Sequence, residues 1–140
     1  MTETILDLGG LLTAYAARSI TQSLAPIAAA ASLARTINGV LVDLSDPAFR
    51  KYASTVSCTD HNAPAFDGVW PGQELVVDCV VELSRLTASP ASRPVVPGSE
   101  RVEGAFTFYR PRLTMRVVSV ASDVDETEAS VAWQIELEEV

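Results

Sequence analysis

The sequence contains few of the side chains that carry most enzyme chemistry. Its 140 residues include one histidine, His61, and two cysteines, Cys58 and Cys79. Catalytic triads and histidine-rich metal sites would all have to use His61, and no second Cys or His pair supplies the other ligands of a zinc site. Gly9-Gly10 is not followed by the Lys-Ser/Thr pair of a phosphate-binding loop. We therefore expect no catalytic residues, no metal and no cofactor.

Basic residues are also scarce. Ten Lys and Arg stand against 18 Asp and Glu, which gives a formal net charge of −8. Nucleic acids and anionic membranes are usually met by clusters of Lys and Arg, so this balance argues against both as direct partners. The longest apolar run, residues 24–34, is broken by Pro26 and is much shorter than the ~20 residues that span a membrane.

The N-terminus lacks the basic start and the cleavage pattern of a secretory signal peptide. We therefore expect a protein that is assembled in the cytosol and is not inserted into a membrane. In that compartment thiols stay reduced, and a reduced cysteine commonly fills a small space in the core. Cys58 and Cys79 are predicted to be two such buried thiols.

What the sequence does contain is a large share of apolar residues, 48%, many of them at alternating positions. Such alternation places one face of a strand against a core. It predicts strands at residues 18–27, 54–59, 73–84, 105–109, 112–121 and 130–140, with an acidic turn at 122–127. Strands at close spacing, without long helical patterns between them, predict an all-β fold, an antiparallel β-sandwich or barrel.

The clearest local signal is Asn38-Gly39, between two short apolar arms at residues 33–37 and 40–44. Both turn residues tolerate positive φ, so the chain is expected to reverse there as a β-hairpin. Ser45-Asp46-Pro47 then reads as a turn or a helix cap, followed by a single helical turn at residues 48–52.

Two segments lie outside the strand pattern of the single domain predicted for residues 18–140. Residues 1–17 form an N-terminal arm or short helix, which either caps the core of its own domain or lies on a neighbouring subunit; the sequence leaves both open. Residues 86–104 form the longest loop, rich in Pro, Ser and Gly. Such a loop is expected to be mobile or to bind a partner.

Aromatic and basic side chains add candidates for a contact surface. Trp133 lies on the apolar face of its strand and is expected in the core, whereas Trp70 precedes a Pro-Gly turn and is an interface candidate. The basic cluster at residues 109–112 suits an acidic partner or a second copy of this acidic chain. The candidate interface residues are Leu11, Leu12, Tyr15, Ile37, Asn38, Gly39, Val40, Trp70, Arg93, Val95, Val96, Arg110 and Arg112.

Several of these stretches together resemble a known group of proteins. The stretches are RTINGVLVDLS at residues 35–45, FRKY at 49–52, SCTD at 57–60, WPG at 70–72 before a valine-rich strand, and YRPRLTM at 109–115. They resemble small virion structural proteins of tailed bacteriophages. The resemblance implies a non-enzymatic virion protein, assembled in the host cytoplasm, that packs against copies of itself and against other virion proteins. It brings no catalytic residues.

From this resemblance we expect a tail subunit, located at the tail tip or baseplate, in the tube or in a neck ring. In a homo-oligomeric ring the same contact is repeated in every copy, so modest contacts per subunit add up. A capsid decoration protein is the alternative within the class. A monomeric β-barrel that binds a small ligand or glycan through Trp70 and the long loop is an alternative of another class, and an enzyme ranks third.

Overall fold

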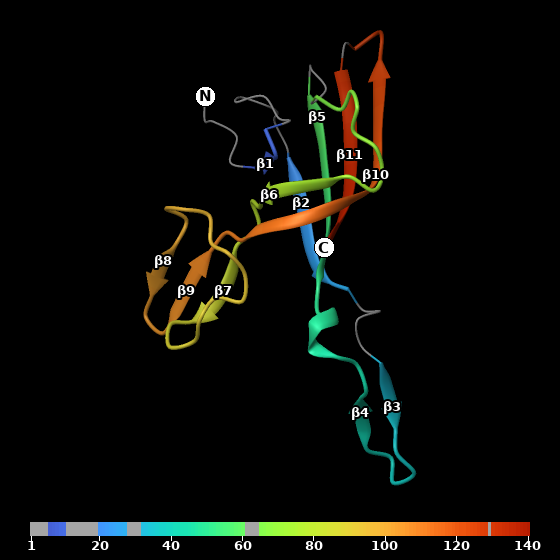
Figure 1. The fold of residues 1–140 in the computed structure, drawn as a ribbon. Coiled ribbons are helices and arrows are strands. Elements are labelled where there is room, and N and C mark those ends of the chain that lie inside the picture. Colours follow the sequence, from blue (N-terminus) through green and yellow to red (C-terminus); the bar gives the residue numbers. More distant parts are fainter. Residues whose placement is uncertain (1–5, 11–19, 28–31, 61–64, 129) are drawn as a thin grey trace.

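The chain is built almost entirely from antiparallel strands, as the computed structural model in Figure 1 shows. The structure describes residues 6–10, 20–27, 32–60, 65–128 and 130–140. These residues form three sheets, of six, two and three strands. The all-β class predicted from the sequence is confirmed.

The largest sheet holds six strands in the order β1-β6-β10-β11-β5-β2. Its strands are β1 (Asp7–Leu8), β2 (Thr21–Pro26), β5 (Tyr52–Asp60), β6 (Glu74–Asp78), β10 (Arg112–Asp125) and β11 (Ser130–Glu139). Each pair of neighbours is antiparallel. β11, whose side chains alternate most regularly between buried and exposed, lies between β10 and β5.

Strand β10 joins the two halves of this sheet and bends in its middle. Its first half pairs with β6, and its register with β11 shifts between Val117 and Ser119. Such a bulge inserts an extra residue and bends the strand. In Figure 1, β6 and the first half of β10 run across the direction of β5 and β11, so the sheet curls into a half-barrel.

The core lies inside this curl. Phe66, from the connection between β5 and β6, packs edge-on against Trp133 with 5.6 Å between ring centroids. Trp133 is therefore a core residue, as predicted, and the thiols of Cys58 and Cys79 are also buried and not joined by a disulfide. The buried cluster comprises Leu6, Leu8, Val56, Cys58, Val77, Cys79, Leu113, Met115, Val117, Trp133, Ile135 and Leu137.

The described part of the N-terminal segment belongs to this core. Leu6 and Leu8 are 2% and 0% exposed, and β1 pairs with β6 through Leu8 and Val77. Of the two possibilities that the sequence leaves open, capping of the chain's own core therefore holds for residues 6–8. The candidate interface residues Leu11, Leu12 and Tyr15 lie outside the described residues, as does His61.

The single strand predicted at residues 73–84 is wrong. The chain leaves the six-stranded sheet after Asp78, and the next strand, β7 (Leu83–Leu86), belongs to another sheet. In the intervening turn, the Gln22 side-chain oxygen accepts hydrogen bonds from the backbone N–H groups of Val80 and Val81, at 2.7 and 3.4 Å. These two donors are therefore satisfied by a side chain and do not need a neighbouring strand.

The predicted loop at residues 86–104 also contains regular structure. β7, β8 (Arg101–Glu103) and β9 (Phe106–Tyr109) form a three-stranded sheet in the order β7-β9-β8, which we call the small sheet. The irregular part of the loop is therefore limited to residues 87–100.

The acidic turn predicted at residues 122–127 begins later than expected. β10 continues to Asp125, because Asp123 pairs with Ala132 and Asp125 with Ser130. The turn then forms around the Asp125 carboxylate, which accepts hydrogen bonds from the backbone N–H groups of Thr127 and Glu128 at 2.8 and 3.0 Å.

Candidate interaction surface

A β-hairpin forms the third sheet and pairs with no other described strand. Its strands are β3 (Leu33–Arg35) and β4 (Leu41–Asp43). The backbone N–H of Gly39 donates to the Thr36 carbonyl at 2.8 Å, so Ile37 and Asn38 are the central residues of the turn and Gly39 follows at φ +83°. The reversal predicted at Asn38-Gly39 is confirmed, but as a three-residue loop that ends in Gly39 at positive φ, rather than as a two-residue Asn-Gly turn.

Hydrogen bonds fix the open end of this hairpin. The Asp43 carboxylate accepts from the Ser45 hydroxyl at 2.6 Å and from the backbone N–H groups of Ser45 and Ser32 at 2.9 and 3.3 Å. These bonds, the Ser45 hydroxyl first, hold the pKa of Asp43 below its usual value. The helix η2 (Pro47–Phe49) follows, capped by Asp46, whose side chain accepts from the Ala48 N–H at 2.9 Å.

The hairpin and η2 carry an unusual concentration of exposed apolar side chains. We call residues 32–51 the hairpin segment. Figure 1 shows its strands projecting away from the six-stranded sheet. Of fifteen exposed large hydrophobic residues in the described chain, six lie in these 20 residues: Leu33 (61% exposed), Ile37 (102%), Val40 (58%), Leu41 (51%), Leu44 (71%) and Phe49 (64%). A hairpin alone is only marginally stable in water, and clustered exposed apolar side chains mark interaction sites.

The charge of the hairpin segment differs from that of the remaining chain. Arg35, Arg50 and Lys51 outnumber Asp43 and Asp46 by one, whereas the whole chain has a formal net charge of −8. The rest of the molecule is therefore strongly acidic, and the hairpin segment is not. This surface is suited to a partner face that is apolar and carries a slight negative charge.

An ion pair anchors the base of the hairpin segment. The Arg93 and Glu139 side chains are 20% and 10% exposed and approach to 2.7 Å. Arg93 also donates to the Arg50 carbonyl at 2.8 Å, and Glu139 accepts from the Tyr52 N–H at 3.0 Å. The Arg93 guanidinium lies 5.3 Å from the centroid of the Tyr52 ring. We call these four residues the base clamp, because they tie β5, β11 and residues 87–100 together where the hairpin segment ends.

Residues 87–100 are thus held by contacts within the chain. Val95 forms a β-bridge with Pro111, the Val96 N–H donates to the Arg110 carbonyl at 2.9 Å, and Val96 is only 9% exposed. The contacts found for the candidate interface residues Arg93, Val95 and Val96 are therefore internal. We leave these three residues out of the interaction surface that we propose.

The remaining candidates are distributed over other parts of the surface. Arg112 forms a bidentate ion pair with Asp78, at 2.6 and 3.1 Å, and this pairing raises the pKa of Arg112. Arg110 is half-buried beside the small sheet, where its N–H donates to Ser99 Oγ at 3.2 Å. Trp70 is 70% exposed in a turn between β5 and β6, which lies outside the hairpin segment in the sequence. Among the predicted residues that the structure describes, the hairpin therefore groups Ile37, Asn38, Gly39 and Val40, and Val96 lies beside Arg110 at the small sheet.

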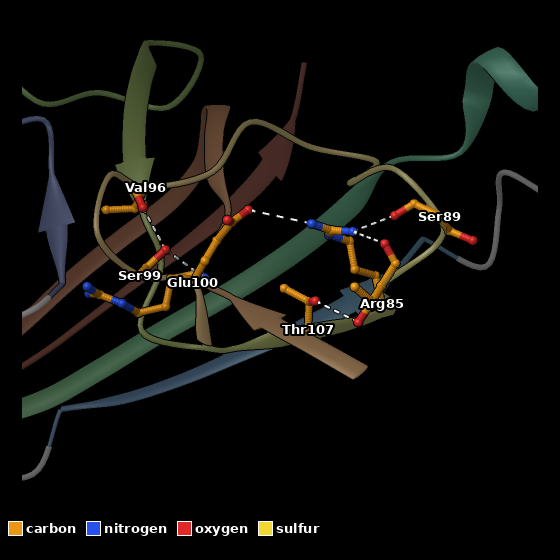
Figure 2. Close-up of polar contacts among 8 residues, drawn as sticks. Arg85, Ser89, Val96, Ser99, Glu100 and Thr107 are labelled. Carbon is orange, nitrogen blue, oxygen red and sulfur yellow. Dashed lines mark hydrogen bonds and ion pairs between the residues drawn. The ribbon is translucent and has the colours of Figure 1, made fainter. Parts of the chain in front are cut away.

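One face of the small sheet is covered by its own loop, as Figure 2 shows. Arg85 donates to the carbonyls of Thr87 and Ser89, at 3.3 and 2.5 Å. Ser99 Oγ donates to the Val96 carbonyl at 2.6 Å, and the hydroxyls of Thr87 and Thr107 are 3.1 Å apart. These contacts hold the loop across the sheet and bury Thr107, which is 1% exposed.

Two open depressions lie on the six-stranded sheet among the residues that the structure describes. One, of about 370 Å³, is lined mainly by small and polar residues of β2, β5, β10 and β11, and its carboxylate is that of Asp123. Within the described ranges, no group of three or more His, Cys, Asp or Glu side chains is placed to hold a metal ion. The described helices include none that is long and apolar enough to cross a membrane.

Because the thiol of Cys79 is buried, we expect the free energy of unfolding to fall at high pH. Burial raises its pKa from the ordinary value of 9.0 to about 11. In the unfolded chain the thiol releases its proton near pH 9, whereas the folded chain holds it until about pH 11, so stability falls through this window by roughly 2 kcal/mol. Urea unfolding at pH 8.5 and pH 11 measures this loss. The variant Cys79→Ala should lose less stability over the same interval, and an equal loss in both proteins would contradict the prediction.

Sequence reasoning identified the tip of the hairpin but missed most of its surface. Leu33, Leu41, Leu44 and Phe49 complete the apolar patch, and their signal was present in the apolar arms and in η2. This signal does not by itself indicate a surface patch, because an apolar residue in a predicted strand is ordinarily assigned to the core. Tyr52 and Glu139 of the base clamp carry no local signal, since their contacts join distant segments.

Comparisons of the chain with protein families, with curated proteins and with solved structures give no match. The functional conclusion therefore depends on the resemblance of the sequence and on the geometry of the hairpin segment.

Proposed function

We propose that the chain is a non-enzymatic structural subunit of a tailed-bacteriophage virion, acting in the tail through contacts between subunits. The observation that carries this proposal is the hairpin segment, in which six large apolar side chains are exposed and whose two strands pair with no other described strand. Its 20 residues match the ~20–30 residues that each partner contributes to a protein interface of standard size.

The free energy available from covering this surface suits an assembly contact. Full burial of one large apolar side chain stabilises by about 1.5–3 kcal/mol, and these six are exposed by about half or more. Burying them contributes roughly 5–10 kcal/mol before the entropy cost of association is subtracted. A single contact of this kind is weak, and its repetition around a ring makes it strong.

The placement in a phage tail is supported by the resemblance of residues 35–45 and the other matching stretches to small virion proteins. The partners are then further copies of this chain and other virion proteins, and the location is the virion. The net charge of −8 favours protein partners over packaged nucleic acid. A tail-tip, tube or neck position and the alternative of capsid decoration differ in copy number.

We expect this protein to be present in purified particles at the copy number of one or a few small rings. Quantitative mass spectrometry against the major capsid protein measures that ratio. A ratio near that of the capsid protein would move the proposal to a tube or capsid decoration protein. Absence of the protein from particles would overturn the virion proposal and favour a ligand-binding module.

A further inference from the structure

The small sheet has one face that its own loop does not cover. Leu86 lies directly opposite Phe106 on the neighbouring strand, and the two are 55% and 51% exposed. Phe108 follows on the same side of β9, and the Arg101 guanidinium lies 4.4 Å from its ring centroid. We call this the open face; its residues are Ser84, Leu86, Arg101, Glu103, Phe106 and Phe108.

The open face is backed by buried side chains and bordered by charge. Its reverse side holds Thr107 and Tyr109, 1% and 2% exposed, so the sheet is anchored from behind. Arg101 pairs with Glu82 and Glu103 at 3.3 and 2.7 Å, which leaves the border with one net negative charge. An apolar surface with a slightly acidic border is the complement of the apolar, slightly basic hairpin segment.

The two surfaces cannot cover each other within one chain as it is folded here. Figure 1 shows the hairpin and the small sheet projecting from different sides of the six-stranded sheet. A contact between two hairpin segments would also place two surfaces of the same net charge, one positive each, against one another. Like charges brought together in this way oppose association, whereas the border of the open face has the opposite sign.

We propose that the hairpin segment of one copy packs on the open face of the small sheet of a second copy. This inference depends on the proposed function and specifies its contact. The contact uses two different surfaces, so it is heterologous. In an open chain of copies, only the copy at each end has one surface unused. Heterologous contacts produce closed rings when the rotation between copies closes, which fits a tail ring.

The test uses two complementary variants of the full chain. Ile37→Ser/Val40→Ser removes apolar side chains from the hairpin, and Leu86→Ser/Phe106→Ser removes them from the open face. All four side chains are more than half exposed, so these changes leave the core intact. Each variant alone should associate about 30-fold or more weakly than the natural chain, as expected for central interface side chains. Mixed together, they should form a 1:1 dimer, because each retains one intact surface.

Native mass spectrometry with one variant isotopically labelled counts the mixed dimers. Val124→Ser is the matched control, since Val124 is 72% exposed on the six-stranded sheet, and it should assemble like the natural chain. If the natural chain assembles but the two variants do not combine, the inference is overturned and the proposed function stands. If the natural chain stays monomeric when concentrated, self-contact is excluded, and the copy number in particles still decides the proposed function.

A disulfide trap locates the contact directly. Asn38→Cys places a thiol at the hairpin tip, and Ser84→Cys places one on the exposed open face. The natural thiols of Cys58 and Cys79 are 6% and 0% exposed, so they contribute little background. Oxidation of the mixture should yield mainly the heterodimer, and Ala132→Cys on the six-stranded sheet should not replace Ser84→Cys. A preference of Asn38→Cys for its own homodimer would overturn the inference.

Discussion

Replacing residues 33–43 by a four-residue Gly-Ser-Asn-Gly turn should abolish assembly of the chain while the domain stays folded. The Leu44 N–H donates to the Ser32 carbonyl at 2.8 Å, so the two ends of the excised hairpin already lie side by side and a short turn joins them without strain. β3 and β4 form a separate sheet, and the core cluster contains no residue of the hairpin. The free energy of unfolding should therefore change by less than about 1 kcal/mol.

Sedimentation velocity measures assembly of this variant, and urea unfolding measures its stability. The control carries Asn38→Ser, which leaves all six exposed apolar side chains of the hairpin segment in place and should assemble normally. If the shortened chain assembles as strongly as the natural chain, the hairpin is excluded as the contact, and the exposed Trp70 becomes the next interface candidate. Loss of folding in the shortened chain would show that the hairpin supports the core, against the topology described above.

The hairpin was predictable because its signal is local. Asn38-Gly39 and the two apolar arms fix a reversal within a dozen residues, and only the turn type differed. The exposure of both hairpin faces was not predictable in the same way. An apolar arm looks the same whether it joins a sheet or projects from it, and only the pairing of β3 with β4 alone shows the difference.

The predicted strand at residues 73–84 failed for a related reason. Leu75, Val77, Cys79, Val81 and Leu83 alternate without interruption because both parts of the segment bury one face, although in different sheets. The turn between the parts is set by the side chain of Gln22, which lies almost 60 positions earlier in the chain. Periodicity predicts which residues are buried, and it does not predict which sheet buries them.

The long Pro-rich loop shows the same limit at the candidate site. Its composition is typical of a mobile segment, and residues 87–100 do lack strands. The loop is nevertheless held by Arg93, whose ion-pair partner Glu139 is 46 positions away. A pair of this separation is visible only once β11 and the loop have been brought together. The proposed contact surface therefore keeps the predicted hairpin, leaves out this loop and adds one face of the small sheet.

The substitution Arg93→Ala should destabilise the chain by about 3 kcal/mol, because it leaves the Glu139 carboxylate largely buried without its ion-pair partner. The substitution of the other partner, Glu139→Gln, should reduce stability by less, since the amide oxygen can still accept from the Tyr52 N–H at a similar position. The matched control is Arg101→Ala, whose ion pairs are about half exposed and should contribute less than about 1 kcal/mol. Urea unfolding of these variants measures the costs.

The double variant Arg93→Ala/Glu139→Gln separates the ion pair from the other contacts of both side chains. A coupling free energy of about 1 kcal/mol or more would assign the stability to the pair itself, whereas additive costs would contradict the base clamp. Hydrogen exchange at the Tyr52 amide supplies a local readout, because this N–H is protected by Glu139 in the natural chain. Faster exchange there, with the β10 and β11 amides unchanged under native conditions, would show that the clamp holds the chain in place where the hairpin segment ends. In the contact proposed above, the hairpin segment packs on the open face of a second copy, so Arg93→Ala should then also weaken assembly, although Arg93 lies outside both proposed surfaces.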